Sequence, residues 1–199
     1  MNYKIVTLAL LNNDQINQLA RLHHTVMDSL LSDLGLPLVE RYYQIARADA
    51  SVIGICALGA DGHPLGWAVG SPNPNQVNRR MSEARVWFIV QMVRAVVTRP
   101  SSILQLVASA RTSSLQMKAG AVELTYIGVD ESARKRGVGR ALLNSFIEAA
   151  REKKFTSVAL SVEAENTDAI ALYTHAGFKI THSFTEGRFN RHRMELTLQ

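Results

Sequence analysis

The stretch that decides the fold is VELTYIGVDESARKRGVGRALLNSF, residues 122–146. Its first part is rich in β-branched and aromatic side chains, which predicts a buried strand over residues 122–129. From Val138 onward apolar residues recur at helical spacing and predict an amphipathic helix with one face turned to a core. A short loop rich in arginine, lysine and glycine joins the two elements.

This loop has the features of an anion site. The first turn of a helix leaves backbone N–H groups without an intrahelical acceptor, and they point toward the loop. Gly137 and Gly139 remove side chains where a phosphate would approach the backbone. The surrounding cationic residues are Arg134, Lys135, Arg136 and Arg140. The pattern would suit a pyrophosphate, although the glycine spacing alone is equally typical of a solvated basic turn that opens an ordinary helix.

A second motif lies downstream, where Asn166 is followed by Ala169, Ile170, Leu172, Tyr173 and then Gly177-Phe178. The pattern Arg134-x-x-Gly137-x-Gly139 after a strand resembles the acyl-CoA signature of the GNAT superfamily, the N-acetyltransferases related to histone acetylases. The downstream motif is similar to the other signature of that family. The two motifs cover residues 122–178, and a weaker similarity in element order covers the rest except residues 71–119.

The resemblance implies an α/β (α+β) fold with a mixed central sheet of about six to seven strands flanked by helices. Residues 1–199 would form a single N-acetyltransferase domain. Residues 71–119 would form a helical insertion between the third and fourth strands, where most family members have a short turn.

The other elements follow from periodicity and capping signals. Asn12 and Gln15 have capping-box spacing at the start of a helix, and Asn166 or Thr167 can cap a later helix that ends before Gly177. The strand at 157–162 should run parallel to the strand at 122–129, because a helix connects them. The remaining predictions are strands at 3–10, 52–58 and 65–69, a helix at 38–48, and a hairpin of 179–185 with 193–198.

The insertion has two predicted parts. Residues 71–82 are rich in proline and asparagine and predict an irregular polar loop. Residues 83–97 predict a helix that is apolar almost all round, and a second helix is predicted to end near residue 109. The charged residues and the short apolar runs of the helix predicted for 83–97 argue against a membrane span. The apolar surface could form an extra layer on the sheet, a homodimer contact, a membrane-surface contact or a lid over the acceptor pocket.

Composition narrows the function. The chain has 199 residues, 47% of them hydrophobic, and a formal net charge of +5. Basic residues concentrate at 134–140, 151–154 and 188–193, and no stretch interleaves basic with aromatic residues as an RNA-binding strand would, which favours an anionic cofactor over nucleic acid. Cys56 is the lone cysteine, so no internal disulfide can form. No signal peptide is convincing, and we expect a cytoplasmic protein without a transmembrane segment.

Acetyl transfer from a thioester to an amine requires a proton acceptor, polarisation of the carbonyl and a proton donor for the thiolate. The resemblance implies Glu123 as general base, through a water molecule, and Tyr173 as general acid. If Glu123 points to the cleft, strand alternation places Thr125, Ile127 and Val129 on its face. The residues expected to bind acetyl-CoA are Ile127, Gly128, Val129, Arg134, Lys135, Arg136, Gly137, Val138, Gly139, Arg140, Asn166 and Tyr173.

No metal site is expected, since His23 and His24 are adjacent and would point about 100° apart on a helix.

The family resemblance implies an N-acetyltransferase in which a primary amine attacks acetyl-CoA directly in a ternary complex. A small-molecule amine or an amino sugar is the expected acceptor. Two alternatives remain: a non-catalytic acyl-CoA-binding sensor or partner-binding module on the same fold, and a nucleic-acid-binding protein, for which only the net charge speaks.

Overall fold

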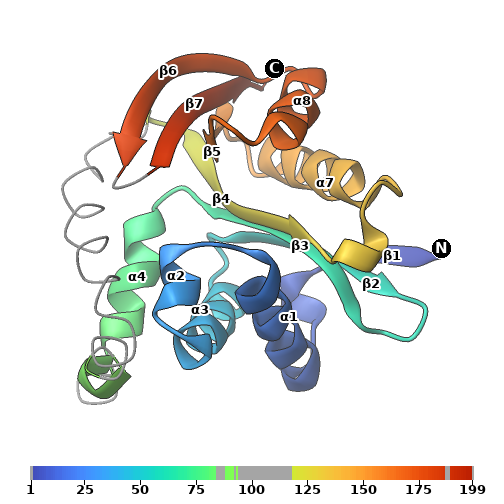
Figure 1. The fold of residues 1–199 in the computed structure, drawn as a ribbon, viewed down its shortest axis with the longest axis vertical. Helices are drawn as coiled ribbons and strands as arrows, with labels where there is room; N and C mark the ends of the chain where they lie inside the picture. The colour runs from blue at the N-terminus through green and yellow to red at the C-terminus, as the bar shows by residue number, and fades with distance from the viewer. Residues whose placement is uncertain (1, 84–87, 92, 94–117, 187–188, 199) are drawn as a thin grey trace.

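A computed structural model of the chain describes residues 2–83, 88–91, 93, 118–186 and 189–198. It consists of a seven-stranded sheet with helices on both faces (Figure 1). The strands are β1 (Tyr3–Thr7), β2 (Ile53–Gly59), β3 (Pro64–Ser71), β4 (Ala121–Val129), β5 (Ser157–Glu163), β6 (Lys179–Glu186) and β7 (Phe189–Thr197). The helices are α1 (Asn13–Val26), α2 (Leu30–Asp33), α3 (Leu36–Ala48), α4 (Pro74–Ser82), α7 (Val138–Glu152) and α8 (Thr167–His175), with 3-10 turns η1 (Leu8–Leu10) and η2 (Glu131–Ala133).

The strand order is β1-β2-β3-β4-β5-β7-β6. Only β4 and β5 pair in parallel, as the predicted strand–helix–strand crossover requires, and all other neighbours are antiparallel. The predicted mixed α/β sheet is therefore confirmed. The chain leaves the sheet at the end of β3 and returns at the start of β4, so the long connection lies where the sequence places it.

Two apolar cores cover the two faces of the sheet. On one face, α7 buries Leu142, Leu143 and Phe146 against the strands, with Tyr173 and Phe178 from the α8 region in the same cluster. On the other face, the cluster joins α1 and α3 to the sheet. The stripe of apolar residues predicted for 138–149 is thus the face of α7 that packs on the sheet.

Local signals account for several element boundaries. The capping box of α1 forms, with the Gln15 amide donating to Asn12 Oδ1 at 2.8 Å and the Asn12 amide donating to Gln15 Oε1 at 3.1 Å. Helix α8 is capped by Asn166, whose Oδ1 accepts from the Ala169 amide at 3.1 Å, and Gly177 follows it with φ of 95°.

Several boundaries differ from the sequence prediction. Strand β1 ends at Thr7, because the chain turns into η1 and buries Leu8 against the α1–α3 side. Helix α3 begins at Leu36, since proline is compatible with the first helical turn. Strand β7 already starts at Phe189, which makes the terminal hairpin longer than predicted.

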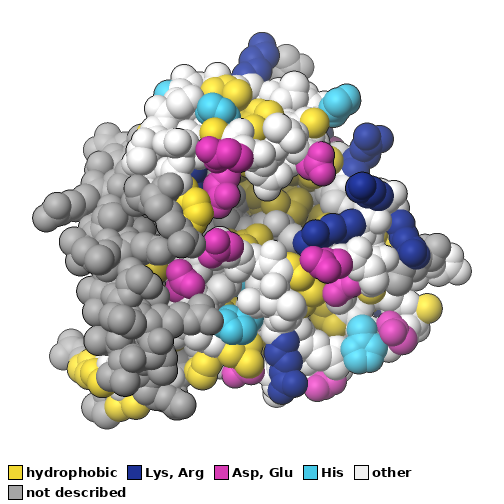
Figure 2. Space-filling model, viewed as in Figure 1, with side chains coloured by type: hydrophobic (Ala, Val, Ile, Leu, Met, Phe, Trp, Pro, Cys, Tyr) yellow, Lys and Arg dark blue, Asp and Glu magenta, His cyan; other side chains and the backbone are white. Residues whose placement is uncertain are grey.

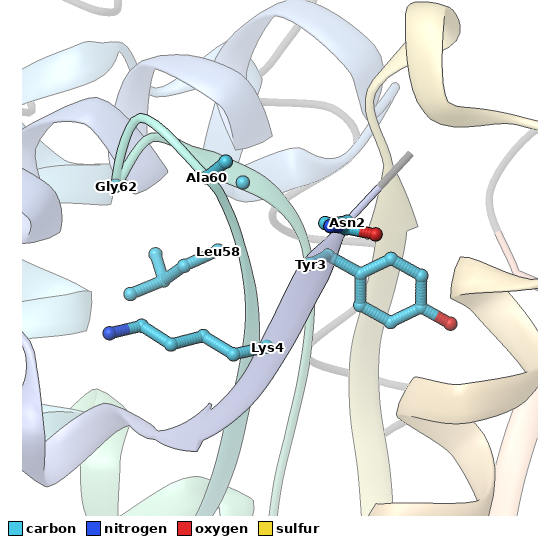
Figure 3. Close-up of a pocket in the computed structure, with 7 residues that line it drawn as sticks. Asn2, Tyr3, Lys4, Leu58, Ala60 and Gly62 are labelled. Carbon is cyan, nitrogen blue, oxygen red and sulfur yellow. The ribbon is translucent and has the colours of Figure 1, made fainter.

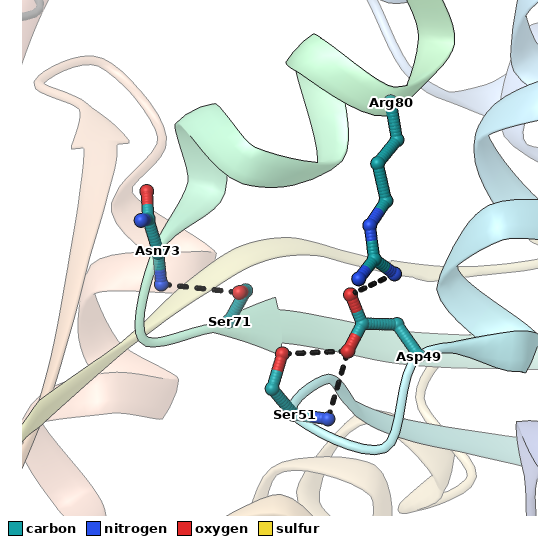
Figure 4. Close-up of polar contacts among 5 residues, drawn as sticks. All are labelled: Asp49, Ser51, Ser71, Asn73 and Arg80. Atoms are coloured by element: carbon teal, nitrogen blue, oxygen red, sulfur yellow. Dashed lines mark hydrogen bonds and ion pairs between the residues drawn. The ribbon is translucent and has the colours of Figure 1, made fainter. Parts of the chain in front are cut away.

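The prediction of an irregular loop over residues 71–82 is wrong, because residues 74–82 form α4. Proline opens this helix, and Val77 and Met81 lie one turn apart and are buried against the α1–α3 core. Figure 4 shows the ion pair that joins α4 to the residue after α3. Arg80 Nη1 lies 2.8 Å from Asp49 Oδ2, while the backbone and side chain of Ser51 both donate to Asp49 Oδ1.

Beyond α4, residues 88–91 and 93 are helical, within the predicted helix of 83–97. Ile89, Val90 and Val93 are exposed there. The rest of that helix, and the one predicted to end near residue 109, lie outside the described residues. In the described part of the chain, no helix has the length and apolar character needed to cross a membrane.

His23 is a fully buried polar residue that links α1 to the sheet. Its ring stacks on Trp67 with centroids 5.4 Å apart and meets the edge of Tyr126 at 4.8 Å. Nδ1 lies 2.6 Å from the Tyr43 hydroxyl and Nε2 lies 3.2 Å from Ser29 Oγ. A neutral ring satisfies both contacts if Tyr43 donates to Nδ1 and Nε2–H donates to Ser29. Burial, and to a lesser degree the nearby His24, lower the pKa of His23 to about 3.

We expect this histidine to make folding pH-dependent. The unfolded chain binds a proton at His23 below a pH of about 6.5, and the folded chain does so only below about 3. The free energy of unfolding therefore falls as the pH is lowered from about 6.5 toward 3. Between pH 7.5 and 5 the loss should be about 2 kcal/mol. Urea unfolding at both pH values should show a flatter pH dependence in His23→Asn by that amount. His182→Asn, at an exposed histidine, is the control, and an unchanged slope in His23→Asn would contradict the assignment.

Candidate functional site

The candidate site lies where β4 and β5 part. Residues 121–123 of β4 pair with residues 157–159 of β5, and the described pairing stops there. On its other side β4 stays paired with β3 through Val129. Residues 124–129 therefore form an edge without a strand partner on the β5 side. In the same view as Figure 1, the space-filling surface is hollowed over the middle of β4, with apolar side chains in the hollow and charged side chains at its rim (Figure 2).

A β-bulge changes which side chains of β4 face each core. The register with β3 shifts between Val69, which pairs with Tyr126, and Gly70, which pairs with Leu124. Because of the extra residue, alternation breaks at Thr125. Ile127 therefore packs in the α7 core, and Tyr126 packs in the α1–α3 core.

This bulge overturns the predicted shared face. Val122 and Leu124 point into the α7 core, so Glu123 between them points to the opposite face of the sheet. Ile127 and Val129 lie on the α7 face, not on the face of Glu123. Strand alternation alone could not reveal the shift, since it depends on the pairing with β3.

Gly70 makes the bulge possible. A Cβ atom built on this residue would collide with the Glu123 carbonyl oxygen and with the ring of Phe146. The backbones of β3 and β4 can approach at this point because no side chain stands between them. Nothing in the sequence around Gly70 indicates this role, and only the register of the two strands makes it visible.

The basic loop begins directly after β4. The Asp130 side chain accepts from the Ser132 amide at 2.9 Å and starts η2. Arg134 Nε then donates to the Val129 carbonyl at 3.3 Å, which joins the loop to the end of β4. Lys135 and Gly137 both adopt left-handed φ angles, 58° and 81°. Such turns aim successive N–H groups into a concave surface that suits an anion.

The first turn of α7 is open above this loop. Arg134, Lys135, Arg136, Gly137 and Arg140 are exposed, whereas Val138 is buried. A Cβ on Gly137 would meet no atom of the described chain within 4 Å, so glycine is required there for its φ angle. The combination of unpaired helix N–H groups, open space and cationic side chains fits a pyrophosphate.

The start of α7 also meets β4 and α8. A Cβ on Gly139 would lie 3.6 Å from Val129 Cγ2 and 3.8 Å from Leu172 Cδ2, which are ordinary contacts. Tyr173, next to Leu172, is buried in the same core and lies 5.8 Å from the Phe178 ring, centroid to centroid. Burial raises the pKa of Tyr173 to about 12. The predicted residues of β4, the basic loop and α8 are thus brought together.

Glu123 has a partner that sequence reasoning missed. Arg193 on β7 lies with Nη1 at 3.1 Å from Glu123 Oε1, and its Nη2 donates to Oε2 at 3.2 Å. Ser161 on β5 accepts a further bond from Arg193 Nη1 at 3.1 Å. The predicted hairpin placed Arg193 on a strand, but only the pairing of β7 with β5 places it beside β4.

Two other features lie apart from this site. A hollow of about 290 Å³ at the β1–β2 edge is lined by Asn2, Tyr3, Lys4, Leu58, Gly59, Ala60 and Gly62, none of them a predicted site residue (Figure 3).

Among the described residues, no group of three or more histidine, cysteine or acidic side chains could hold a metal ion. Cys56 is buried in the α1–α3 core, as expected for a core residue.

Comparison with known proteins agrees with this geometry. Residues 102–178 match the model of the acetyltransferase (GNAT) family. A GCN5-related N-acetyltransferase from Kribbella flavida superposes with a TM-score of 0.65 at 18% identity, over 98% of both chains. A Salmonella typhimurium protein described as an acetyltransferase, solved with its cofactor acetyl-CoA, gives a TM-score of 0.64 at 15% identity, over 100% of this chain and 95% of that chain. Residues 102–178 therefore match the GNAT family, and the chain has the fold of GNAT N-acetyltransferases.

Curated relatives carry a narrower name. The mycothiol acetyltransferase of Jonesia denitrificans is 30% identical over 147 residues, which is 73% of this chain and 46% of that protein. That of Beutenbergia cavernae is 45% identical over 56 residues, 28% of this chain and 19% of that protein. The chain thus spans less than half the length of these relatives.

The two loop glycines should differ in their effect on stability. Gly137→Ala forces a Cβ into the left-handed region and should lower the free energy of unfolding by about 1–2 kcal/mol. Gly139→Ala meets only ordinary contacts inside a helix, where alanine is favoured, and should not destabilise. Urea denaturation of both variants checks this, and equal losses would contradict the assigned roles.

Proposed function

We propose that this GNAT-family chain is an acetyl-CoA-dependent N-acetyltransferase that acts on a primary amine. The observation that carries the proposal is the position of the free edge of β4. Glu123 lies on one face of the sheet at the start of this edge, and Tyr173 lies in the core on the opposite face. A group bound along the edge would have a proton acceptor on one side and a proton donor on the other.

The binding side of the proposal rests on the loop and on β4. The first turn of α7 and the residues from Arg134 to Arg140 would hold the pyrophosphate of acetyl-CoA. Its pantetheine arm would run along Ile127, Gly128 and Val129 as an added strand, since these residues have no strand partner on the β5 side. A backbone N–H on this edge would then polarise the thioester carbonyl. Asn166, at the start of α8, would contact the same arm.

Glu123 is the proposed base. Its side chain is 24% exposed, so a water molecule or an amine can reach the carboxylate. The acceptor would approach on this face of the sheet, beside the α1–α3 layer, where the Tyr126 and Tyr42 ring centroids lie 5.5 Å apart. Glu123 would take a proton from the acceptor's ammonium group through water, which leaves the neutral amine free to attack the thioester.

Tyr173 is the proposed donor to the departing sulfur. With a pKa of about 12 its hydroxyl stays protonated at neutral pH. A thiol titrates near 8.5, so complete proton transfer from this phenol would be uphill by about three to four pKa units. Tyr173 therefore acts by donating a hydrogen bond to the sulfur as negative charge develops there. The net step forms the amide C–N bond and breaks the thioester C–S bond. Of the two protons that the ammonium nitrogen loses, one passes to Glu123 through water before attack and the other ends on the departing sulfur, so the products are the amide and the coenzyme thiol.

The proposed acceptor is a small-molecule amine. Support comes from the relatives named mycothiol acetyltransferase, which match 73% of this chain in one case. The long connection between β3 and β4 also favours a small acceptor, because α4 packs beside α3 on the acceptor side of the sheet. An acyl-CoA-binding sensor is the competing function, and acetyl turnover separates the two.

The phosphate site can be tested by charge reversal at two positions on α7. Arg140→Glu places a negative charge in the first turn and should weaken acetyl-CoA binding by at least about tenfold, equivalent to about 1.4 kcal/mol. Arg151→Glu makes the same change about three turns along the helix and should leave affinity unchanged. Isothermal titration calorimetry of both folded variants measures the difference, and equal affinities would remove the phosphate assignment.

The proton roles can be tested by paired isosteric changes. Glu123→Gln should lower kcat by about 10²–10⁴, because it removes the base while keeping the shape. Tyr173→Phe should lower kcat by about tenfold, because it removes one hydrogen bond to a developing charge. Neither should change acetyl-CoA affinity by more than about twofold. Thiol release with a panel of primary amines is the assay. A wild-type protein that binds acetyl-CoA but releases no thiol would instead support the sensor.

A further inference from the structure

Arg193 crosses the sheet to reach Glu123. Strand β5 lies between β7 and β4, yet the guanidinium contacts the carboxylate through two nitrogen–oxygen pairs, at 3.1 and 3.2 Å. This two-point contact fixes the plane of the carboxylate as well as its position. The Arg193 side chain is only 11% exposed, so its surroundings are mostly protein atoms and not solvent.

Ser161 completes the arrangement. It pairs directly with Arg193 in the β5–β7 ladder, so both side chains project from the same face of the sheet. The Ser161 hydroxyl accepts from Arg193 Nη1 at 3.1 Å and directs the guanidinium toward β4. The contact with Glu123 forms at the last residue where β4 still pairs with β5. It therefore sits at the point from which the two strands diverge.

We infer that Arg193 is a positioning residue, which holds the Glu123 carboxylate in the orientation needed to accept the acceptor's proton. This inference rests on the proposed function. A glutamate side chain has several rotatable bonds, and a half-buried carboxylate without a fixed partner would sample several orientations. An ionised carboxylate has about four lone-pair sites, so two bonds to Arg193 leave sites for a water molecule. Ser161 supports the orientation from β5.

The inference differs from a purely structural ion pair in what it predicts. A structural pair would couple Glu123 and Arg193 in stability only. A positioning role couples them in kcat, because Arg193 contributes to the rate only through Glu123. The effect of removing Arg193 should then vanish once Glu123 has lost its carboxylate.

The experiment is a double-mutant cycle on the full chain with Glu123→Gln, Arg193→Met and the double variant. Thiol release from acetyl-CoA is followed with glucosamine and with putrescine as acceptors. We expect Arg193→Met to lower kcat by about tenfold or more with acetyl-CoA affinity within about twofold of wild type. The double variant should have the kcat of Glu123→Gln alone. Arg193→Lys keeps the charge but loses the planar fork, so it should recover only part of the rate.

Two further variants keep the test decisive. Ser161→Ala leaves no charge unpaired and should fold even if Arg193→Met does not, and we expect it to lower kcat by about two- to threefold. Lys118→Met breaks another ion pair of β7, at Glu195, and should leave kcat unchanged. Independent, additive losses in the cycle, or a wild-type kcat in both Ser161→Ala and Arg193→Lys, would overturn the inference alone. A wild-type kcat in Glu123→Gln, or no thiol release by the wild type, would overturn the proposed function instead.

Discussion

The parting of β4 from β5 is the constraint on which the site depends. Parallel strands normally satisfy each other's backbone groups along their length, but here the described pairing covers only residues 121–123 of β4. The rest of that edge carries backbone donors and acceptors that need another partner. A ligand arm that binds as an added strand would satisfy them, and the same edge ends at the basic loop and the start of α7.

The bulge in β4 determines which side chains of this strand point to each face of the sheet. Without the shift at Gly70, Glu123 and Ile127 would point the same way, and the carboxylate would lie on the same side of the sheet as the residues that pack beside Tyr173. With it, the carboxylate lies on the face that α1 and α3 cover, and the end of β4 packs against α7 and α8. A register shift of one residue therefore leaves the two proposed catalytic side chains, Glu123 and Tyr173, on opposite faces of the sheet.

Buried polar groups connect several elements on the face of the sheet to which Glu123 points. His23 connects α1, α3, β3 and β4 through ring contacts and a hydrogen bond, on the face of the sheet to which Glu123 points. Arg193 and Ser161 do the same for the carboxylate from β7 and β5. Each group lies in a place where an apolar side chain could pack, and its hydrogen bonds offset the cost of burial.

The sequence by itself determined the order of the elements, the βαβ crossover around the basic loop, and the residues of that loop. These features depend on periodicity, capping and glycine chemistry, which act over a few neighbouring residues. It did not reveal α4, since Val77 and Met81 become a helical stripe only against the α1–α3 core. Only the tertiary structure decided which way Glu123 faces and that Arg193 meets it. Both depend on the register between strands that lie far apart in the chain, and nothing local to either residue encodes that register.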